Sequence, residues 1–217
     1  MKVVSIVPIK LNNERLPNKN LRSFTNGRPL ITYILETLLK VKNIDEHYVF
    51  CSSEAIIPHI PDSIKFLKRS ESLDTKTTTS NDILKEFTDK IDADIYVLAH
   101  ATSPFISDKS IEKGVEMVCS RNYDSALSVI VQQDFLWVNG KPFNYDPSNI
   151  PRTQDLNPMY VETGLFIFTR ELFKNDNRRV GYSPYLIELS KIEATDIDEL
   201  EDFEIADAIY NHLILKR

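Results

Sequence analysis

Short apolar runs alternate with amphipathic stretches over most of the chain. The runs are brief, rich in β-branched residues and bounded by polar residues or proline, a pattern typical of buried strands. Strands are therefore expected at residues 3–7, 47–51, 64–67, 95–98, 126–131, 164–169 and 192–197.

The amphipathic stretches between these runs predict helices that bury one face. Pro29 stands where a helix can begin, because proline fits the first turn. Hydroxyl groups at 77–80, and Ser107 or Asp108, can cap two more helices. The last helix is the clearest, because Asp198 and Glu201 have the spacing of a capping box. Its buried face is formed by Leu200, Phe203, Ala206, Ile209 and Leu213.

This alternation of strands and helices predicts an α/β fold with a largely parallel sheet flanked by helices. Residues 133–160 interrupt the alternation with Asn139-Gly140 and several prolines, which indicate turns and an excursion from the sheet. The sequence contains no internal repeat and no linker-like stretch. We therefore expect a single domain over residues 1–217 with an insertion at 133–160.

The chain is mildly acidic, with 26 Lys and Arg against 32 Asp and Glu and a net charge of −6. Nucleic-acid binding is disfavoured, because it draws on a positive field to neutralise phosphates. Cys51 and Cys119 are too few for a disulfide framework and are expected to be reduced core thiols. The chain has neither a signal-peptide pattern nor an apolar stretch of about 18 residues, so a cytoplasmic protein without a membrane partner is expected.

Only five glycines occur in the 217 residues, and neither GxGxxG nor GxxxxGK[ST] is present. A glycine-rich phosphate loop is therefore excluded. Any phosphate group must be held mainly by side chains.

The segment at residues 8–20 follows the first strand, where ligands of α/β sheets bind. Lys10, Arg15 and Lys19 can converge there on one polyphosphate, with Arg as a bidentate fork and Lys as a point charge. By spacing alone, an exposed basic loop on an acidic protein is the better interpretation.

This segment resembles the N-terminal motif of the acylneuraminate cytidylyltransferase family, which includes the 3-deoxy-manno-octulosonate cytidylyltransferases. The family pattern is close to (I/V)-P-A-R-x-x-S-x-R-x-P-x-K-N, followed by a helix opened by G-x-P-L. Lys10 stands where Arg is usual, and Asn12-Asn13 replace small residues. The matching residues here are Val7-Pro8, Lys10, Arg15, Pro17, Lys19-Asn20 and Gly27-Arg28-Pro29-Leu30. The resemblance implies phosphate-binding roles for the three cations and a nucleotide contact for Asn20.

The resemblance continues in order along the chain. The further matching segments are Ser52-Ser53-Glu54, Arg69-Ser70-Glu71, residues 100–105, Arg152-Thr153-Gln154-Asp155-Leu156, residues 160–164 (with Thr163 for the family's Asn) and Asp196-Ile197-Asp198. It implies nucleotide contacts for Ser52, Arg69 and Thr102, and sugar contacts for His100, Arg152, Gln154 and Tyr160. It also implies a Rossmann-like nucleotide-diphospho-sugar transferase fold, with the insertion as a dimerisation or lid element of a homodimer.

Asp196 and Asp198 occupy alternate positions of an extended segment and so point to the same side. Two carboxylates there can hold one Mg²⁺ that also takes triphosphate oxygens. The alternative is that Asp198 only caps the last helix and Asp196 faces solvent. Arg152 has the planar fork that fits the carboxylate of an α-keto acid sugar. Its alternative is a surface arginine in a turn-rich insertion.

The resemblance implies a Mg²⁺-dependent transfer of the cytidylyl group from CTP to a nine-carbon or eight-carbon α-keto acid sugar, with release of pyrophosphate. Lys10, Arg15, Lys19 and Asp198 are the expected catalytic residues. One alternative is a GT-A-like glycosyltransferase, which also uses an Asp-x-Asp motif, although usually in the middle of the chain. The other is a relative that binds nucleotide without turnover.

Overall fold

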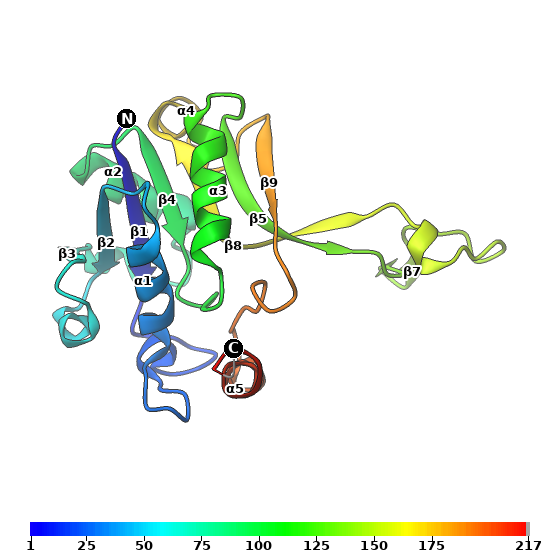
Figure 1. Ribbon diagram of the computed structural model, residues 1–217, viewed down its shortest axis with the longest axis horizontal. Helices are drawn as coiled ribbons and strands as arrows, with labels where there is room; N and C mark the ends of the chain where they lie inside the picture. The colour runs from blue at the N-terminus through cyan, green and yellow to red at the C-terminus, as the bar shows by residue number, and fades with distance from the viewer. Residues whose placement is uncertain (216–217) are drawn as a thin grey trace.

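The computed structural model describes residues 1–215 as a layered α/β structure (Figure 1). Its main strands are β1 (Val3–Ile9), β2 (Glu46–Cys51), β3 (Lys65–Lys68), β4 (Ile95–Ala99), β5 (Ser125–Gln132), β8 (Met159–Thr169) and β9 (Pro184–Glu188). Within residues 1–215 these seven strands form one sheet in the order β3-β2-β1-β4-β8-β5-β9. All neighbouring pairs are parallel except those of β8, which runs antiparallel to β4 and β5. The predicted fold class is thus confirmed.

Helices cover both faces of the sheet. One hydrophobic core contains α1 (Leu30–Lys40) and α3 (Asp108–Cys119), and the other contains α2 (Ser80–Lys90) and α4 (Arg170–Asp176). Ile34, Leu35 and Leu38 of α1 are fully buried. The central strands are buried on both faces, which is why they are near-continuous apolar runs in the sequence.

The helix starts agree with the expected caps, except at the last helix. Thr79 caps α2 and Ser107 caps α3. Helix α5 (Leu200–Ile209) is capped by Glu199 in a capping box with Asp202, so the prediction of Asp198 and Glu201 as the box was wrong. The Asp202 carboxylate accepts the N–H groups of both Asp198 and Glu199, which leaves the Asp198 side chain available for other partners.

The strand expected at residues 192–197 was also wrong, because the last strand is β9. Ser190 and Glu193 bond to each other's backbone N–H groups and fold the following residues into a turn. Ile197 is buried in an irregular segment, where its N–H donates to the Thr102 carbonyl over 2.9 Å. Its apolar character reflects that burial rather than a strand.

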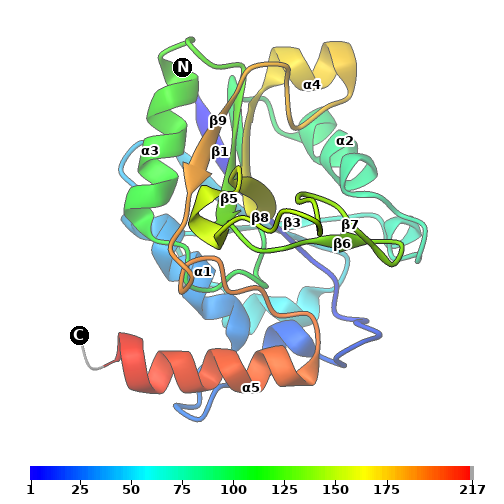
Figure 2. The ribbon, with the colours of Figure 1, turned by 90° about the vertical axis from the view of Figure 1, so that its right-hand side faces the viewer.

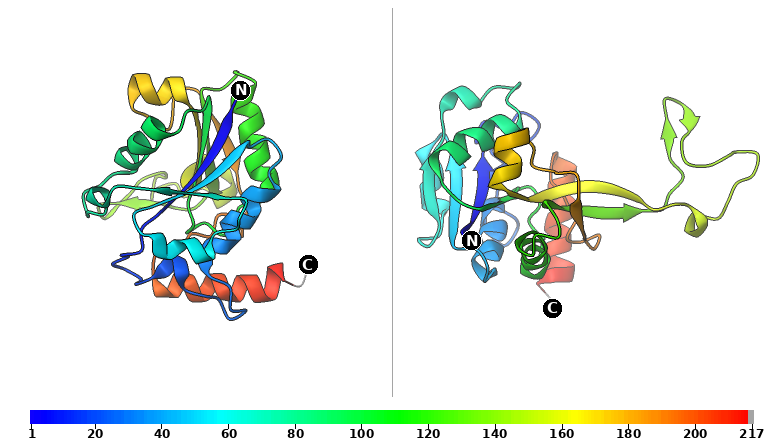
Figure 3. Two further views of the ribbon diagram at one scale, coloured as in Figure 1. Left: turned by 90° about the vertical axis from the view of Figure 1, so that its left-hand side faces the viewer. Right: turned by 90° about the horizontal axis from the view of Figure 1, so that it is seen from above.

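Residues 133–158 leave the sheet on a ribbon formed by the outer halves of β5 and β8 (Figure 1). We call residues 129–162 the arm; seen from above, it projects far from the sheet (Figure 3). It carries the hairpin of β6 (Trp137–Val138) and β7 (Lys141–Pro142) and the short helix η4 (Thr153–Asp155). Asn139 and Gly140 turn this hairpin with positive φ angles of 50° and 74°, as a two-residue hairpin turn requires.

Helix α5 and the π-helical turn η5 (Tyr210–Ile214) lie across the end of the molecule next to α1 (Figure 2). Five aromatic rings pack against one another at this contact, namely Phe24, Tyr33, Phe105, Phe203 and Tyr210. The ring centroids are 5.0 Å apart for Phe24 and Phe203 and 4.9 Å apart for Tyr33 and Tyr210. The C-terminal segment is thereby held against the region that follows β1.

The remaining expectations concern the cysteines and the membrane. Cys51 and Cys119, both in the described part of the chain, are free thiols as expected. Cys51 is buried and Cys119 is partly buried. None of the helices in residues 1–215 combines the length and the apolar character needed to cross a membrane.

Candidate active site

The loop at residues 8–20 and the segment at residues 196–198 meet at the carboxyl edge of the sheet. The Lys19 ammonium donates to the Ile197 carbonyl over 2.6 Å and lies 3.3 Å from Asp198 Oδ1. Arg15 Nη2 lies 2.8 Å from the same Asp198 oxygen. The Lys19 side chain is only 9% exposed, whereas those of Arg15 and Asp198 are 62% and 40% exposed. Two of the three predicted cations therefore converge on one carboxylate.

The loop at residues 100–105 forms the third side of this site. The Ser103 hydroxyl donates to Asp196 Oδ1 over 3.4 Å, and the His100 N–H donates to the Gly164 carbonyl over 2.9 Å. A Cβ atom at Gly164 would lie 2.0 Å from Ser103 Oγ, so only glycine allows β8 to approach this loop so closely. Thr102 is held through its carbonyl by the N–H of Ile197.

His100 is the titratable group at the centre of this region. Burial lowers the pKa of its imidazole, and the positive charge of Arg179 lowers it further. Asp196 and Asp198 raise the pKa, and Lys19 lowers it. His100 is therefore neutral at pH 7 and can donate from one ring nitrogen and accept at the other.

Asn20 and Lys10 organise the loop itself. The buried Asn20 amide donates to the Lys10 carbonyl over 3.1 Å and so fixes the path of the loop. The Lys10 side chain lines a pocket of about 310 Å³ together with Arg69, Thr75 and Thr78. The third predicted cation therefore faces this pocket, beside the pair formed by Arg15 and Lys19 with Asp198.

Arg69 is buried at the end of β3 and pairs with Asp74 through one terminal nitrogen. Its Nε atom is buried without a hydrogen-bond partner within residues 1–215. A buried polar atom without a partner is rare in native structures and points to a ligand or solvent group that completes it. Ser52, also buried, lines an adjacent pocket of about 590 Å³ with Asp74.

The predicted sugar-binding residues Arg152, Gln154 and Tyr160 lie on the arm, apart from the loop at residues 8–20 (Figure 1). All three are exposed. The Arg152 guanidinium pairs with Asp155 at 2.7 and 2.8 Å. One chain by itself therefore does not bring these residues to the other site residues.

A group that the sequence analysis missed is the pair Arg178-Arg179, between α4 and β9. Arg179 stacks on the Phe166 ring, 4.2 Å from its centroid, and Phe166 lies 6.0 Å from the His100 ring. The only local signal in the sequence is two adjacent arginines in a loop, which by itself predicts a solvated surface.

Asp196 and Asp198 are the two carboxylates at this edge whose fit to a metal ion can be tested. Within the described residues no group of three or more His, Cys, Asp or Glu side chains is placed to hold a metal. Mg²⁺ does not require one, because it is commonly held by one or two carboxylates together with substrate phosphates and water. Asp196 and Asp198 fit that donor set.

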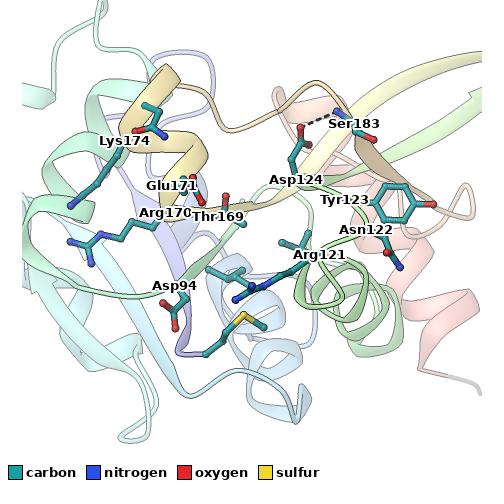
Figure 4. Close-up of a pocket in the computed structure, with 14 residues that line it drawn as sticks. Asp94, Arg121, Asn122, Tyr123, Asp124, Thr169, Arg170, Glu171, Lys174 and Ser183 are labelled. Carbon is teal, nitrogen blue, oxygen red and sulfur yellow. Dashed lines mark hydrogen bonds between the residues drawn. The ribbon is translucent and has the colours of Figure 1, made fainter.

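Another pocket, of about 880 Å³, lies at the other edge of the sheet (Figure 4). It is lined by residues at the start of strands, among them Asp94 before β4 and Asp124 before β5. The Asp124 carboxylate is already used, since it accepts the N–H groups of Tyr182 and Ser183. Ligands of such sheets bind at the carboxyl ends of the strands, so we assign the site to the edge with Lys19 and Asp198.

Comparison with known proteins gives concordant matches. The family model described as Cytidylyltransferase matches residues 4–214. The N-acylneuraminate cytidylyltransferase of Streptococcus agalactiae serotype III is 26% identical over 94% of this chain and 52% of its own length, so the chain spans about half of that relative. The pseudaminic acid cytidylyltransferase of Campylobacter jejuni serotype O:2 is 23% identical over 98% of each chain.

Solved structures agree in fold. The structure of CMP:2-keto-3-deoxy-manno-octonic acid synthetase complexed with CTP superposes with a TM-score of 0.75 at 19% identity and covers 97% of this chain and 99% of its own. A 4-diphosphocytidyl-2C-methyl-D-erythritol synthase from Anaerococcus prevotii gives a TM-score of 0.68 at 15% identity and covers 97% of this chain and 96% of its own. The expected Rossmann-like nucleotidyltransferase fold is confirmed.

We predict that acid weakens the fold through His100. Because burial lowers the pKa of this imidazole below its ordinary 6.5, the unfolded chain binds a proton more readily, and the free energy of unfolding falls as the pH drops below about 6.5. The partly buried His47 also has a lowered pKa, because burial disfavours its charged form, and it contributes in the same direction.

Urea unfolding at about pH 7.5 and about pH 5.5 measures this effect, which is at most about 1.4 kcal/mol per pH unit for each histidine. The His100→Gln variant should lose part of the pH dependence, whereas the control His212→Gln, at an exposed position, should keep all of it. Identical pH profiles for wild type and His100→Gln would contradict the assignment.

Proposed function

This chain belongs to the cytidylyltransferase family, and we propose that it transfers the cytidylyl group of CTP to an acidic α-keto sugar of eight or nine carbons. The observation that carries the proposal is the convergence of Arg15 and Lys19 with Asp198 at the carboxyl edge of the sheet. The names of these similar proteins support the acceptor class, since they specify N-acylneuraminate, pseudaminic acid and 2-keto-3-deoxy-manno-octonic acid.

In the proposed reaction the anomeric hydroxyl oxygen of the sugar attacks the α-phosphorus of CTP. The bond from this phosphorus to the bridging oxygen breaks, pyrophosphate leaves, and the hydroxyl proton passes to solvent. Arg15 and Lys19 would exchange their contacts with Asp198 for contacts with phosphate oxygens and offset the charge that develops there. Lys10 would reach the nucleotide from the neighbouring pocket, beside Arg69.

Asp196 and Asp198 would hold a Mg²⁺ ion between them and the triphosphate. Such an ion neutralises phosphate charge and favours loss of the hydroxyl proton. The Ser103 hydroxyl, bonded to Asp196, would keep that carboxylate oriented toward the site. Neutral His100 would donate a hydrogen bond to an oxygen of the acceptor.

We also propose that the arm joins two copies of the chain. In one copy it exposes several large apolar side chains, namely Phe135, Trp137, Val138, Phe143 and Ile150. Such a concentration is unusual on a monomer and marks an interface. A second copy fits best, because Arg152 and Gln154 on the same arm would then reach the acceptor site of that copy.

Pyrophosphate release tests the function directly. We expect release with CTP and a sugar acid from a panel of eight-carbon and nine-carbon α-keto acids, and slower release with the other three nucleoside triphosphates. Lys19→Met should reduce turnover by about 100-fold or more, as loss of one oxyanion donor does. The control Lys109→Met changes an exposed lysine of α3 and should retain activity.

Absence of release with every nucleotide by a folded protein would favour a binding role instead. Sugar transfer from a nucleotide sugar without pyrophosphate release would favour a glycosyltransferase.

The metal assignment is tested by Asp198→Asn. Loss of one carboxylate charge should lower turnover by about 100-fold at a fixed Mg²⁺ concentration, with unchanged circular dichroism. Glu201→Gln, an exposed carboxylate of α5, is the control and should leave the Mg²⁺ dependence intact. Wild-type Mg²⁺ dependence in Asp198→Asn would rule the assignment out.

Subunit mixing tests whether Arg152 acts across a dimer. Lys19→Met and Arg152→Gln should each be weakly active alone. After subunit exchange, the mixture should recover about a quarter of wild-type activity, because half of the dimers are mixed and each mixed dimer has one intact site. No recovery would show that Lys19 and Arg152 must come from the same chain, and a monomer in sedimentation would refute the dimer.

A further inference from the structure

The guanidinium groups of Arg178 and Arg179 both lie over aromatic rings. The Arg179 guanidinium lies 4.2 Å from the centroid of Phe166, and that of Arg178 lies 4.4 Å from the centroid of Tyr182. A stacked guanidinium keeps its N–H groups in the plane of the fork, where they can bind a planar carboxylate with two bonds. The stacking therefore orients the donors and leaves them available.

Arg179 differs from most other arginines in its charge balance. Arg15, Arg28, Arg69, Arg152 and Arg170 each form an ion pair with an Asp or Glu side chain. Within residues 1–215, Arg179 has no such pair, and Glu162 is the one carboxylate whose charge acts on it. Burial removes part of the hydration of this cation and so lowers the pKa of Arg179. A partly desolvated cation without an ion pair is costly unless a ligand supplies the anion.

The position of Arg179 relates it to the active site. It shares the Phe166 ring with His100, and the charges that act on His100 are those of Arg179, Asp196, Asp198 and Lys19. The charge of Arg179 therefore influences the same imidazole as the charges of Lys19, Asp196 and Asp198. It also lines a pocket of about 450 Å³ between the first turn of α2 and Glu162 of β8.

We propose that Arg179 binds the carboxylate of the acceptor sugar and so selects an acid over a neutral sugar. This inference rests on the proposed function. It assigns the carboxylate to a residue of the same chain as Lys19, whereas Arg152 on the arm is exposed and has its fork occupied by Asp155. Arg152 then contacts another part of the acceptor.

The test compares each sugar acid with its carboxamide, which has nearly the same shape and no charge. For the acid, Arg179→Gln should raise KM by about 10- to 100-fold and leave the KM for CTP unchanged, since one charge-assisted bidentate contact is lost. For the carboxamide, wild type and Arg179→Gln should be alike. Arg121→Gln, at the opposite edge of the sheet, is the control and should match wild type on both compounds.

Three results would overturn the proposal: an unchanged KM for the acid, an equal loss for acid and carboxamide, or discrimination lost in Arg152→Gln instead. Arg179→Lys keeps the charge without the stacked fork and should recover only part of the affinity. Thermal unfolding of each variant separates a folding defect from a binding defect.

Calorimetric titration distinguishes this proposal from the proposed function. If no acid supports pyrophosphate release, the function fails, and binding of N-acetylneuraminate and 3-deoxy-manno-octulosonate is measured instead. Binding to wild type that is lost in Arg179→Gln supports the role of Arg179. Equal binding to both proteins, or binding to neither, refutes it.

Discussion

The site depends on the contacts of the buried Lys19 ammonium with Ile197 and Asp198. Removing a charge from water costs roughly several kcal/mol unless polar partners replace the hydration. Its partners are the Ile197 carbonyl at 2.6 Å and Asp198 at 3.3 Å, which are 178 and 179 residues away in the sequence. The burial of Lys19 therefore depends on the loop after β1 and the segment before α5 lying together. The aromatic cluster around Phe24 and Phe203 supports the same junction from the apolar side.

This junction also offers a way in which a chain with five glycines could carry out the proposed phosphate chemistry. Glycine-rich loops bind phosphate through backbone N–H groups. Here the side chains of Arg15 and Lys19 supply the positive charge, and the Asp198 carboxylate balances it. An incoming triphosphate would replace one anion by a stronger one. The positive charge is local, so the net charge of −6 is compatible with a small anionic substrate.

His100 lies between two groups of charges. The charges of Lys19, Asp196 and Asp198 act on it from the side of the proposed nucleotide site, and the charge of Arg179 acts on it from the side of Phe166. A neutral imidazole can lie near both groups, because a charged one would be repelled by Lys19 and Arg179. Gly164 keeps this arrangement tight, since a larger residue would displace Ser103 and with it the bond to Asp196.

The sequence alone determined the layers, because strands buried on both faces are apolar runs and the helices repeat at three to four residues. It also identified the loop with Lys10, Arg15 and Lys19, because the basic residues and the resemblance to the family motif both lie within one short segment. It misplaced the last strand, because Ile197 is buried, and Ile192 and Ala194 are partly buried, without strand pairing. Only the tertiary structure decided that Asp198 faces two cations instead of capping α5, that Arg152 lies far out on the arm, and that Arg179 stacks on Phe166. Asp198 meets Arg15 and Lys19 from far along the chain, and Arg179 meets Phe166 through the packing of its loop against β8, so local pattern carries no information about these contacts. The sequence indicated that residues 133–160 leave the sheet, but how far the arm carries Arg152 from the site depends on its path in space (Figure 1).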